Sequence, residues 1–392
     1  MRDVSRPAFA AMYLLVILNV IIHGCLTGSR VVMALFAIEL GVNAFSIGIM
    51  AALYSLTPLL LGVTAGRAAD RYGVKPPMLF GAVLCGVGLM LPYLWPKVAT
   101  LYVSATVIGA GFVIYNVAVQ NLTGAWGPRE DRAKNFSTLS LGYSISSFIG
   151  PLAVGYVIEY SDHAHAYLYL SLSTLLAVAI LLSYRKLREV RTPPAAEHTQ
   201  SAFSLLLQPE LRKVLLTGAM IVTGWDLYMF YLPLYGHSIG LAPSTIGIIL
   251  GMFAVATFVV RFWLPQLNAR FTARRVLAVS MYFGALVFTV FPFAGNAWLI
   301  GALSFGIGLA LGCGQPITLL MAYNRSPPGR TGEVTGVRMT LNHFTHTVVP
   351  VVAGGLGAAF GMTPVFVMIA SVLGVSGYLS ATVRRAEPPP PA

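Results

Sequence analysis

Charged residues are scarce in this chain. Only 10% of its 392 residues are Asp, Glu, Lys or Arg, whereas 57% are hydrophobic. This balance leaves too little polar surface to cover a water-soluble protein of that length, so a soluble enzyme or binding domain is excluded. Cysteine is scarce too: Cys25, Cys85 and Cys313 are odd in number and lack metal-ligand spacing. We therefore expect small apolar fillers at these positions, and no disulfide, metal or cofactor.

The sequence also lacks the motifs of nucleotide-driven and hydrolytic proteins. It has no phosphate-binding loop, and no Ser-His-Asp arrangement in an extramembrane domain. An enzyme is not predicted, and direct drive by ATP is not expected. An intramembrane enzyme or a passive channel remains a distant alternative.

Long polar stretches are missing, and apolar runs of about 18 to 25 residues recur instead, each long enough to cross a bilayer as a helix. The pattern predicts an all-α integral membrane protein with twelve transmembrane helices. The first run is too long for a signal peptide and has no small-residue cleavage site, so we expect it to remain as the first helix. The approximate spans are 11–40, 45–66, 77–95, 99–124, 136–158, 165–184, 211–237, 244–266, 275–293, 297–323, 334–358 and 363–383.

The net charge of +12 follows the topology. Lys97 lies alone in a loop on one side and Arg30 lies within the first span. The other 23 of the 25 Lys and Arg lie in, or within a turn of, the segments on the side of the N-terminus. This positive-inside pattern predicts cytoplasmic termini and a cytoplasmic 185–210 loop in the inner membrane. The basic excess is explained by the lipid bilayer, and no nucleic-acid partner is expected.

The second half of the sequence repeats the first. The segment "GVNAFSIGI" at 41–49 matches "GLAPSTIGI" at 240–248, a displacement of 240 − 41 = 199 residues. The same displacement sets Pro151 and Gly155 against Pro350 and Gly354. One offset kept over many spans indicates duplicated six-helix halves, which run parallel because an even number of spans returns the chain to the same face.

A polar, proline-containing linker separates the two copies. We therefore predict an N-terminal half at 1–184, a cytoplasmic linker at 185–210 and a C-terminal half at 211–392. Over nearly its full length, this arrangement resembles the major facilitator superfamily. The resemblance implies a monomer that moves a small solute by alternating access, often together with protons.

The stretch "GRAADRYGVK" at 66–75 carries the most specific part of the resemblance. The superfamily has a Gly-x-x-x-Asp-Arg-x-Gly-x-Lys/Arg signature between its second and third helices. The matching residues are Gly66, Asp70, Arg71, Gly73 and Lys75. The resemblance implies a cytoplasmic latch, in which Gly66 permits a close helix approach and Asp70 caps a helix end. The alternative is a solvated loop whose cations only fix orientation.

The fifth predicted span contains a glycine-proline pattern, "GYSISSFIGPLAVGY". It resembles the motif of antiporters in this superfamily, with Val154 in place of a usual glycine, and implies efflux. The predicted hinge residues are Gly142, Gly150, Pro151 and Gly155. Ordinary transmembrane glycine and proline are the alternative reading. Ala105 stands where multidrug antiporters carry an arginine, so coupling through that arginine is not carried over.

Ionisable groups inside the membrane are costly, by about 2.5 to 3.5 kcal/mol on insertion scales, so each one is a candidate for function. Asp226 is the only carboxylate deep within a span, and we expect it to exchange a proton or to sit in a permanent ion pair. Arg30 falls against Met229 in the repeat, three residues beyond Asp226. It is predicted to bind an anionic solute, to pair with Asp226, or to reach the outer interface.

Further polar residues are expected around the central cavity. Arg338, Asn342 and His346 follow each other at i, i+4 and i+8 on one helical stripe, which we expect to face the cavity or a neighbouring helix. The alternative for Arg338 alone is that it reaches the cytoplasmic interface. Asn116 and Gln315 are equivalent in the repeat. The aromatic candidates, which offer apolar and hydroxyl contacts, are Trp225, Tyr228 and Tyr231. We interpret His23 as a packing residue and Arg261 as an anchor at a cytoplasmic helix end.

These features predict a proton-coupled secondary transporter of a small organic, anionic solute, working in the direction of efflux. The alternative is proton-symporting uptake of an organic acid. The identity of the solute is not encoded in any motif of the sequence.

Overall fold

The computed structural model describes residues 5–125, 132–184, 202–326 and 331–383. Within these ranges the regular structure is helical and contains no strand. The first six helices are α1 (Ser5–Glu39), α2 (Ala44–Tyr72), α3 (Lys75–Leu94), α4 (Val98–Ala125), α5 (Arg132–Tyr160) and α6 (His163–Ser183). The others are η3 (Ala202–Leu207), α7 (Pro209–Ser238), α8 (Pro243–Arg270), α9 (Ala273–Val290), η4 (Phe291–Phe293), α10 (Ala297–Gly312), α11 (Gly314–Tyr323), α12 (Thr331–Phe360) and α13 (Thr363–Thr382).

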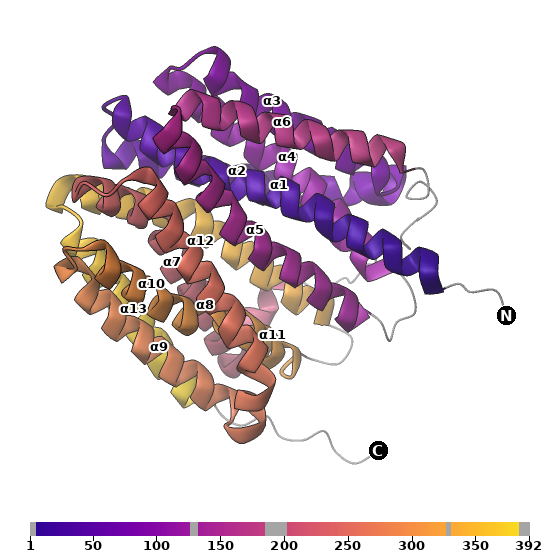
Figure 1. Cartoon of the computed structure of the whole chain (residues 1–392). Helices are drawn as coiled ribbons and strands as arrows, with labels where there is room; N and C mark the ends of the chain where they lie inside the picture. Colours follow the sequence, from indigo (N-terminus) through magenta and orange to yellow (C-terminus); the bar gives the residue numbers. More distant parts are fainter. Residues whose placement is uncertain (1–4, 126–131, 185–201, 327–330, 384–392) are drawn as a thin grey trace.

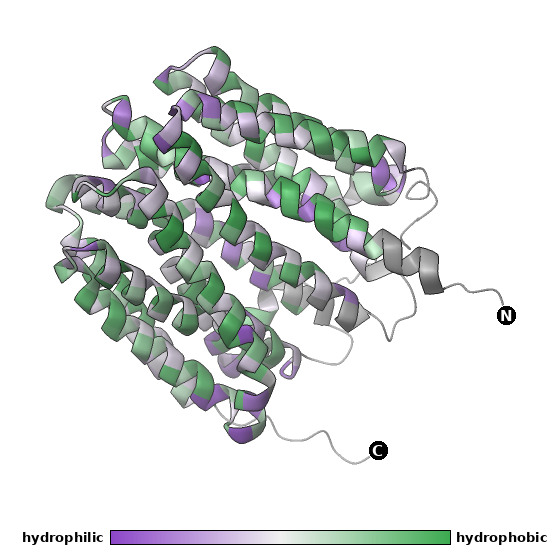
Figure 2. Cartoon of the chain, viewed as in Figure 1, coloured by the Kyte–Doolittle hydropathy of each residue, from purple (hydrophilic) through white to green (hydrophobic). Residues whose placement is uncertain are grey.

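The predicted all-α membrane fold is confirmed. Eleven segments of the described residues are long and apolar enough to cross a bilayer. The 30-residue helix α12, eleventh in chain order, corresponds to the remaining predicted span at 334–358. Helices are the natural solution here because backbone polar groups cannot hydrogen-bond to water inside the hydrocarbon core. Figure 2 shows hydrophobic residues along the whole length of most helices, with hydrophilic residues gathered toward their ends.

The tenth span keeps its predicted bounds of 297–323, and its helix is interrupted at one residue. It is divided into α10 and α11 at Cys313. Gly312 and Gly314, which flank the break, have low helix propensity. Pro316 has no N–H to donate to the carbonyl of Gly312, four residues earlier. The sequence therefore weakens the helix on both sides of Cys313.

Short polar caps and glycine turns connect the helices. Asn43 accepts a hydrogen bond from the backbone N–H of Ser46 at the start of α2 (2.9 Å), and Asp162 accepts one from His165 at the start of α6 (2.7 Å). The turns after α1 and α7 use Gly41 (φ +74°) and its repeat equivalent Gly240 (φ +78°). That backbone conformation strains any residue with a Cβ, so glycine is required in both copies.

The helices form two groups that meet along α2, α5, α8 and α12. Figure 1 shows α1–α6 (indigo to magenta) in the upper part and α7–α11 with α13 in the lower part, and α5 packs on α8 while α2 packs on α12. We call the side where α1 begins and α13 ends the terminal side. The domain boundaries at 184 and 210 remain a prediction, because residues 185–201 lie outside the described residues. Within the predicted linker, the described part contains the short helix η3.

Two close approaches between the two groups lie near the helix ends opposite the terminal side. A Cβ on Gly48 of α2 would lie 3.3 Å from Cα of Gly354 on α12. A Cβ on Gly155 of α5 would likewise lie 3.3 Å from Cα of Gly247 on α8. These two crossings are related by the same 199-residue displacement as the sequence repeat. Backbones can approach this closely only where side chains are absent.

One polar contact reinforces the second crossing. A carboxylate oxygen of Glu159, near the end of α5, accepts a hydrogen bond from the backbone N–H of Ser244 in the first turn of α8 (3.1 Å). A carboxylate at a helix N-terminus is stabilising because the unpaired N–H groups there carry partial positive charge. The two halves are thus fastened together on the side opposite the termini.

Candidate functional site

A small pocket lies between the two halves, near the middle of α7 and α12. It has about 30 Å³ of free space, which is room for a water molecule or two and not for an organic solute. Its charged and polar lining residues are Arg30, Ser55, Asp226 and His346. The apolar part of the lining consists of Met33, Ala34, Ala51, Met229, Phe230 and Pro350. The pocket therefore combines both charge signs with an apolar wall.

Asp226 and His346 form an ion-pair contact inside this pocket. Asp226 is on α7 and His346 on α12, and the Nδ1 atom of His346 meets Oδ2 of Asp226. The Asp226 side chain is only 6% exposed, whereas that of His346 is 27% exposed. Oδ1 of Asp226 is buried and makes no hydrogen bond to the described residues. A carboxylate and an imidazole in contact can share one proton and release it when their surroundings change.

Arg30 lines the same pocket from α1. Its guanidinium group donates a long hydrogen bond to Oγ of Ser55 (3.5 Å) and lies 5.6 Å from the ring centre of Tyr54. Its Nε is buried without a hydrogen-bond partner. In the described part of the chain, no ion pair joins Arg30 to Asp226, whose carboxylate contacts His346 instead. Arg30 thus keeps donors available for another anion.

The apolar wall of the pocket was not predicted from the sequence. Met33, Met229 and Phe230 are ordinary hydrophobic residues in apolar spans, so composition does not distinguish them from lipid-facing neighbours. The repeat did contain a signal, because Met229 is the equivalent of Arg30. Both residues line the pocket, one from each half.

The other polar candidates lie nearer the terminal side and tie helices together within each half. Arg338 on α12 donates to Oε1 of Gln315 on α11. Tyr143 on α5 donates to Oδ1 of Asn116 on α4. Asn116 and Gln315 are repeat equivalents, so both halves use the same position for this tie. Asn342 lies between Arg338 and His346 on α12, and its Oδ1 is buried without a partner.

The aromatic candidates lie beside the pocket and not on its lining. Tyr228 is 1% exposed and stacks on Phe253 of α8, with ring centres 4.6 Å apart. Trp225 meets the same Phe253 edge-on at 4.7 Å. Tyr231 is fully buried and donates its hydroxyl hydrogen to the carbonyl of Ala353 on α12. In this conformation the three rings hold α7 against α8 and α12.

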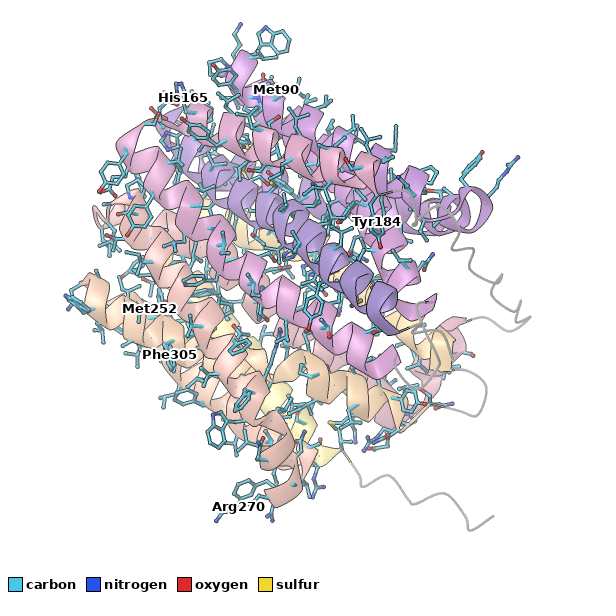
Figure 3. All side chains as sticks on the ribbon, turned by 45° about the vertical axis from the view of Figure 1, so that its right-hand side comes forward. Met90, His165, Tyr184, Met252, Arg270 and Phe305 are labelled. Carbon is cyan, nitrogen blue, oxygen red and sulfur yellow. The ribbon has the colours of Figure 1, made fainter. Side chains whose placement is uncertain are left out.

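His23 and Arg261 complete the predicted polar residues. The Nδ1 atom of His23 lies 2.6 Å from Oγ of Ser146 on α5, as its interpretation as a packing residue requires. Arg261 lies three residues before the end of the apolar span Pro243–Leu264, and its interpretation as an anchor at the cytoplasmic end of that span stays a prediction. Helix α8 continues for nine more residues to Arg270, which Figure 3 labels at the end of the helix.

A larger apolar groove of about 360 Å³ lies between α2, α3 and α4 near the terminal side. Its walls include Leu61, Tyr72, Pro77, Phe80 and Ile114, and none of its lining residues is charged. The groove offers nothing that could couple to a proton or bind an ion. The pocket with Arg30 and Asp226 is therefore the candidate site.

Comparison with known proteins identifies the family. The sequence profile of the Major Facilitator Superfamily matches residues 13–350, and a second match covers residues 214–392. The chain belongs to the major facilitator superfamily. It is a multi-pass membrane transporter of small solutes and not an enzyme.

Relatives within the superfamily include two resistance proteins. The chain is 22% identical over 370 residues to the quinolone resistance protein NorA of Staphylococcus aureus (strain MRSA252), covering 91% of this chain and 92% of that protein. It is 25% identical over 348 residues to the multidrug resistance protein MdtG of Klebsiella pneumoniae (strain 342), covering 85% of this chain and 83% of that protein.

Among solved structures, a bacterial homologue of the human lysosomal transporter Spinster has the same fold. The superposition gives a TM-score of 0.79 at 12% identity and covers 96% of this chain and 97% of the other. At that identity the likeness concerns the fold alone.

The structure accounts for some of the residues in the superfamily's signature loop and not for others. Gly73 ends α2 with φ +78°, which explains a glycine there. Arg71 is exposed and lies over the ring of its neighbour Tyr72 at 5.4 Å. At Gly66 a Cβ would meet no described atom within 4 Å, so the predicted close helix approach is absent in this conformation. The side chain of Asp70 lies outside the described residues, and the latch itself remains a prediction.

Lys75 binds the end of another helix. Its Nζ donates to the backbone carbonyls of Tyr184 (2.7 Å) and Leu182 (3.4 Å) at the end of α6. In Figure 3, Tyr184 is labelled at that end and His165 at the beginning of the same helix. A cation is stabilising there because the last carbonyls of a helix are unpaired and carry partial negative charge.

The second half repeats this arrangement at the same displacement. Arg274, the equivalent of Lys75, donates to the carbonyl of Val383 at the end of α13 (3.1 Å). Val383 is in turn the equivalent of Tyr184. In both halves, therefore, a cation at the start of the third helix caps the end of the last one.

The predicted hinge residues lie at close helix crossings. A Cβ on Gly28 of α1 would lie 3.1 Å from the carbonyl oxygen of Gly150 on α5. Gly142 faces Val16 of α1, where a Cβ would meet Cγ1 at 3.0 Å. Gly155 and the neighbouring Pro151 face α8 at the crossing described above. The glycines allow α5 to pack closely on both partners, and movement at Pro151 remains a prediction.

We predict that Lys75→Met lowers stability and Lys97→Met does not. Lys75 is 8% exposed and caps α6, so its loss leaves two carbonyls without their charged donor and costs about 1 to 2 kcal/mol. Lys97 is an exposed loop cation and serves as the matched control. Thermal unfolding in detergent measures both variants. Equal midpoints for Lys75→Met and wild type would contradict the cap.

Proposed function

We propose that this protein is a proton-coupled exporter of a small organic anion. The observation that carries the proposal is the pocket between the halves, which holds a carboxylate-imidazole contact beside an arginine with free donors. The first group can carry a proton and the second can hold an anion. Because both line one pocket of about 30 Å³, an entering solute has to displace the groups around the proton site.

Proton coupling follows from the contact between Asp226 and His346, because protonation of Asp226 weakens the attraction between them. When Asp226 is ionised, it holds His346 against α7. Protonation of Asp226 removes its negative charge, and the attraction between α7 and α12 is weakened. Since α12 also forms one of the crossings between the halves, loosening it favours separation of the halves on the side opposite the termini. A proton and a solute can then exchange alternately at one site.

The residues that line the pocket indicate the chemical class of the solute. Arg30 presents a planar set of donors that suits a carboxylate or sulfonate, while Met33, Met229 and Phe230 suit an apolar body. An amphipathic anion matches both parts. A strongly hydrated inorganic ion would leave the apolar wall unused.

The direction and the setting are proposed from the relatives and from the charge pattern. Two relatives are named for resistance to quinolones and to multiple drugs, which fits removal of a solute from the cell. The positive-inside pattern favours cytoplasmic termini in the inner membrane. The structure then represents a state closed on the outer side. The pocket is formed within a single chain, which supports function as a monomer.

The solute can be identified by untargeted metabolite profiling of cells with and without the gene. An organic anion that accumulates inside cells lacking the gene is the expected result. Its uptake into proteoliposomes is then measured with and without a pH gradient. Depletion inside those cells would instead favour proton-symporting uptake of an organic acid.

We predict that Asp226→Asn separates proton coupling from solute exchange. The amide keeps the size of the side chain but cannot release a proton, so gradient-driven transport should fall at least about 100-fold. Exchange of labelled solute without a gradient should continue within a few-fold of wild type. Both are measured in proteoliposomes with matched protein content. Gradient-driven transport at the wild-type rate would exclude Asp226 as the coupling group.

We further predict that Arg30 acts through its planar geometry. Arg30→Lys keeps the charge but loses the paired donors, so the half-saturating solute concentration should rise about tenfold, and Arg30→Ala should raise it about 100-fold. Thermal stability should change little, because no carboxylate of the described residues depends on Arg30. If Arg30→Ala instead unfolds the protein and Asp226→Asn restores it, Arg30 is a partner of Asp226 and not a solute ligand.

A further inference from the structure

A second group of polar residues gathers where the tenth span is broken, between the pocket and the terminal side. The break leaves the carbonyl of Gly312 without its helical donor, because the residue four positions later is Pro316. Arg261 of α8 fills this gap, since its Nε donates to the Gly312 carbonyl at 3.2 Å. The Nη1 of Arg261 also donates to Oγ of Ser144 on α5 at 3.1 Å, which crosses to the other half.

Arg338 reaches the other side of the same break. It donates through Nη2 to Oε1 of Gln315, three residues after Gly312 and in the first turn of α11. Its Nε is buried without a partner, and so is Oδ1 of the nearby Asn342. Two guanidinium groups from different helices therefore converge on one short stretch of chain, and one of them keeps a buried donor unused.

The charges around the break are not balanced by the protein. Neither Arg261 nor Arg338 forms an ion pair with a carboxylate of the described residues, and their partners are neutral oxygens. A cation within a span costs about 2.5 to 3.5 kcal/mol even after it adapts to the membrane. Capping one carbonyl of a broken helix needs only one donor. The second arginine, Arg338, whose Nε is buried without a partner, is explained if an anion binds beside it.

The position of Arg338 connects this place with the central pocket. Arg338, Asn342 and His346 follow each other on one stripe of α12, and His346 lines the pocket. Eight residues of helix separate Arg338 from His346, which corresponds to about 12 Å. An anion that moved along this stripe would pass from the terminal side to Arg30 and Asp226.

We propose that Arg261 and Arg338 form an anion-binding subsite at the break between α10 and α11. It receives the carboxylate or sulfonate group of the solute from the terminal side before the solute reaches Arg30. The subsite rests on the proposed function for its role in transport. Its existence as an anion site can be tested without transport and without the natural solute.

The test uses Asn342→Cys, which places a thiol one helical turn from Arg338. Two thiol reagents of similar size carry fixed and opposite charges, the sulfonatoethyl and the trimethylammonioethyl methanethiosulfonates. Their reaction rates are measured on the protein in lipid nanodiscs. The native cysteines Cys25, Cys85 and Cys313 are buried, and wild-type protein gives the blank. A positive subsite makes the sulfonate reagent react about tenfold faster than the cationic one.

Charge variants in the Asn342→Cys background show which arginines cause the faster reaction with the sulfonate reagent. Arg261→Gln with Arg338→Gln should remove the preference for the sulfonate reagent. Arg30→Gln is the matched control, because it removes the arginine of the central pocket and should leave the preference unchanged. Benzenesulfonate should slow labelling in the Arg30→Gln protein and not in the Arg261→Gln, Arg338→Gln protein. If the double variant does not fold, Arg338→Gln alone must still lower the preference several-fold.

Three results would overturn the subsite. The first is equal rates for the two reagents, and the second is a preference that persists without both arginines. The third is no labelling by either reagent, because a loading site must be reached by water. A preference that is lost with Arg30→Gln would assign the anion attraction to the central pocket alone. Failure of the transport predictions for Arg30 and Asp226 would leave these labelling results intact, so the two proposals fail separately.

Discussion

The contact between Asp226 and His346 is the constraint on which the rest of the structure depends. A carboxylate within the membrane needs a partner, because an isolated charge there costs several kcal/mol. The partner lies 120 residues away in sequence, so α7 and α12 must meet at this level of the bilayer. Since α12 also crosses α2, the same contact connects the interior of the C-terminal half to the junction between the halves.

The two halves use the same kinds of helix contact at equivalent positions. Glycine crossings join α2 with α12 and α5 with α8, and cations at the starts of α3 and α9 cap the ends of α6 and α13. The charged groups break the symmetry, because Asp226 corresponds to Thr27, His346 to Ser147 and Arg30 to Met229. A symmetric frame with an asymmetric set of charges suits alternating access, because the frame can move while the charges favour one state over the other.

Hydropathy and the 199-residue displacement predict much of this frame, because long apolar spans and glycine crossings are local properties of the sequence. The displacement even pairs Lys75 with Arg274, whose contacts turn out to be equivalent. Neither hydropathy nor the displacement predicts which side chains of different helices contact each other. The stripe of Arg338, Asn342 and His346 was predicted to face the cavity or a neighbouring helix, and the sequence did not say which residue does which: His346 lines the pocket, whereas Arg338 contacts Gln315 on α11. The interruption at Cys313 was missed because glycine and proline are common in membrane helices.

A double-mutant cycle on Asp226 and His346 tests the central contact most directly. The unfolding free energies of wild type, Asp226→Asn, His346→Gln and the double variant are measured in lipid nanodiscs. Removing one member of a buried pair leaves the other without its partner, so each single change should cost about 3 to 5 kcal/mol. The double variant should then be more stable than the sum of the two losses implies, by at least about 1 kcal/mol. Additive losses would show that the two side chains act independently and would contradict the account.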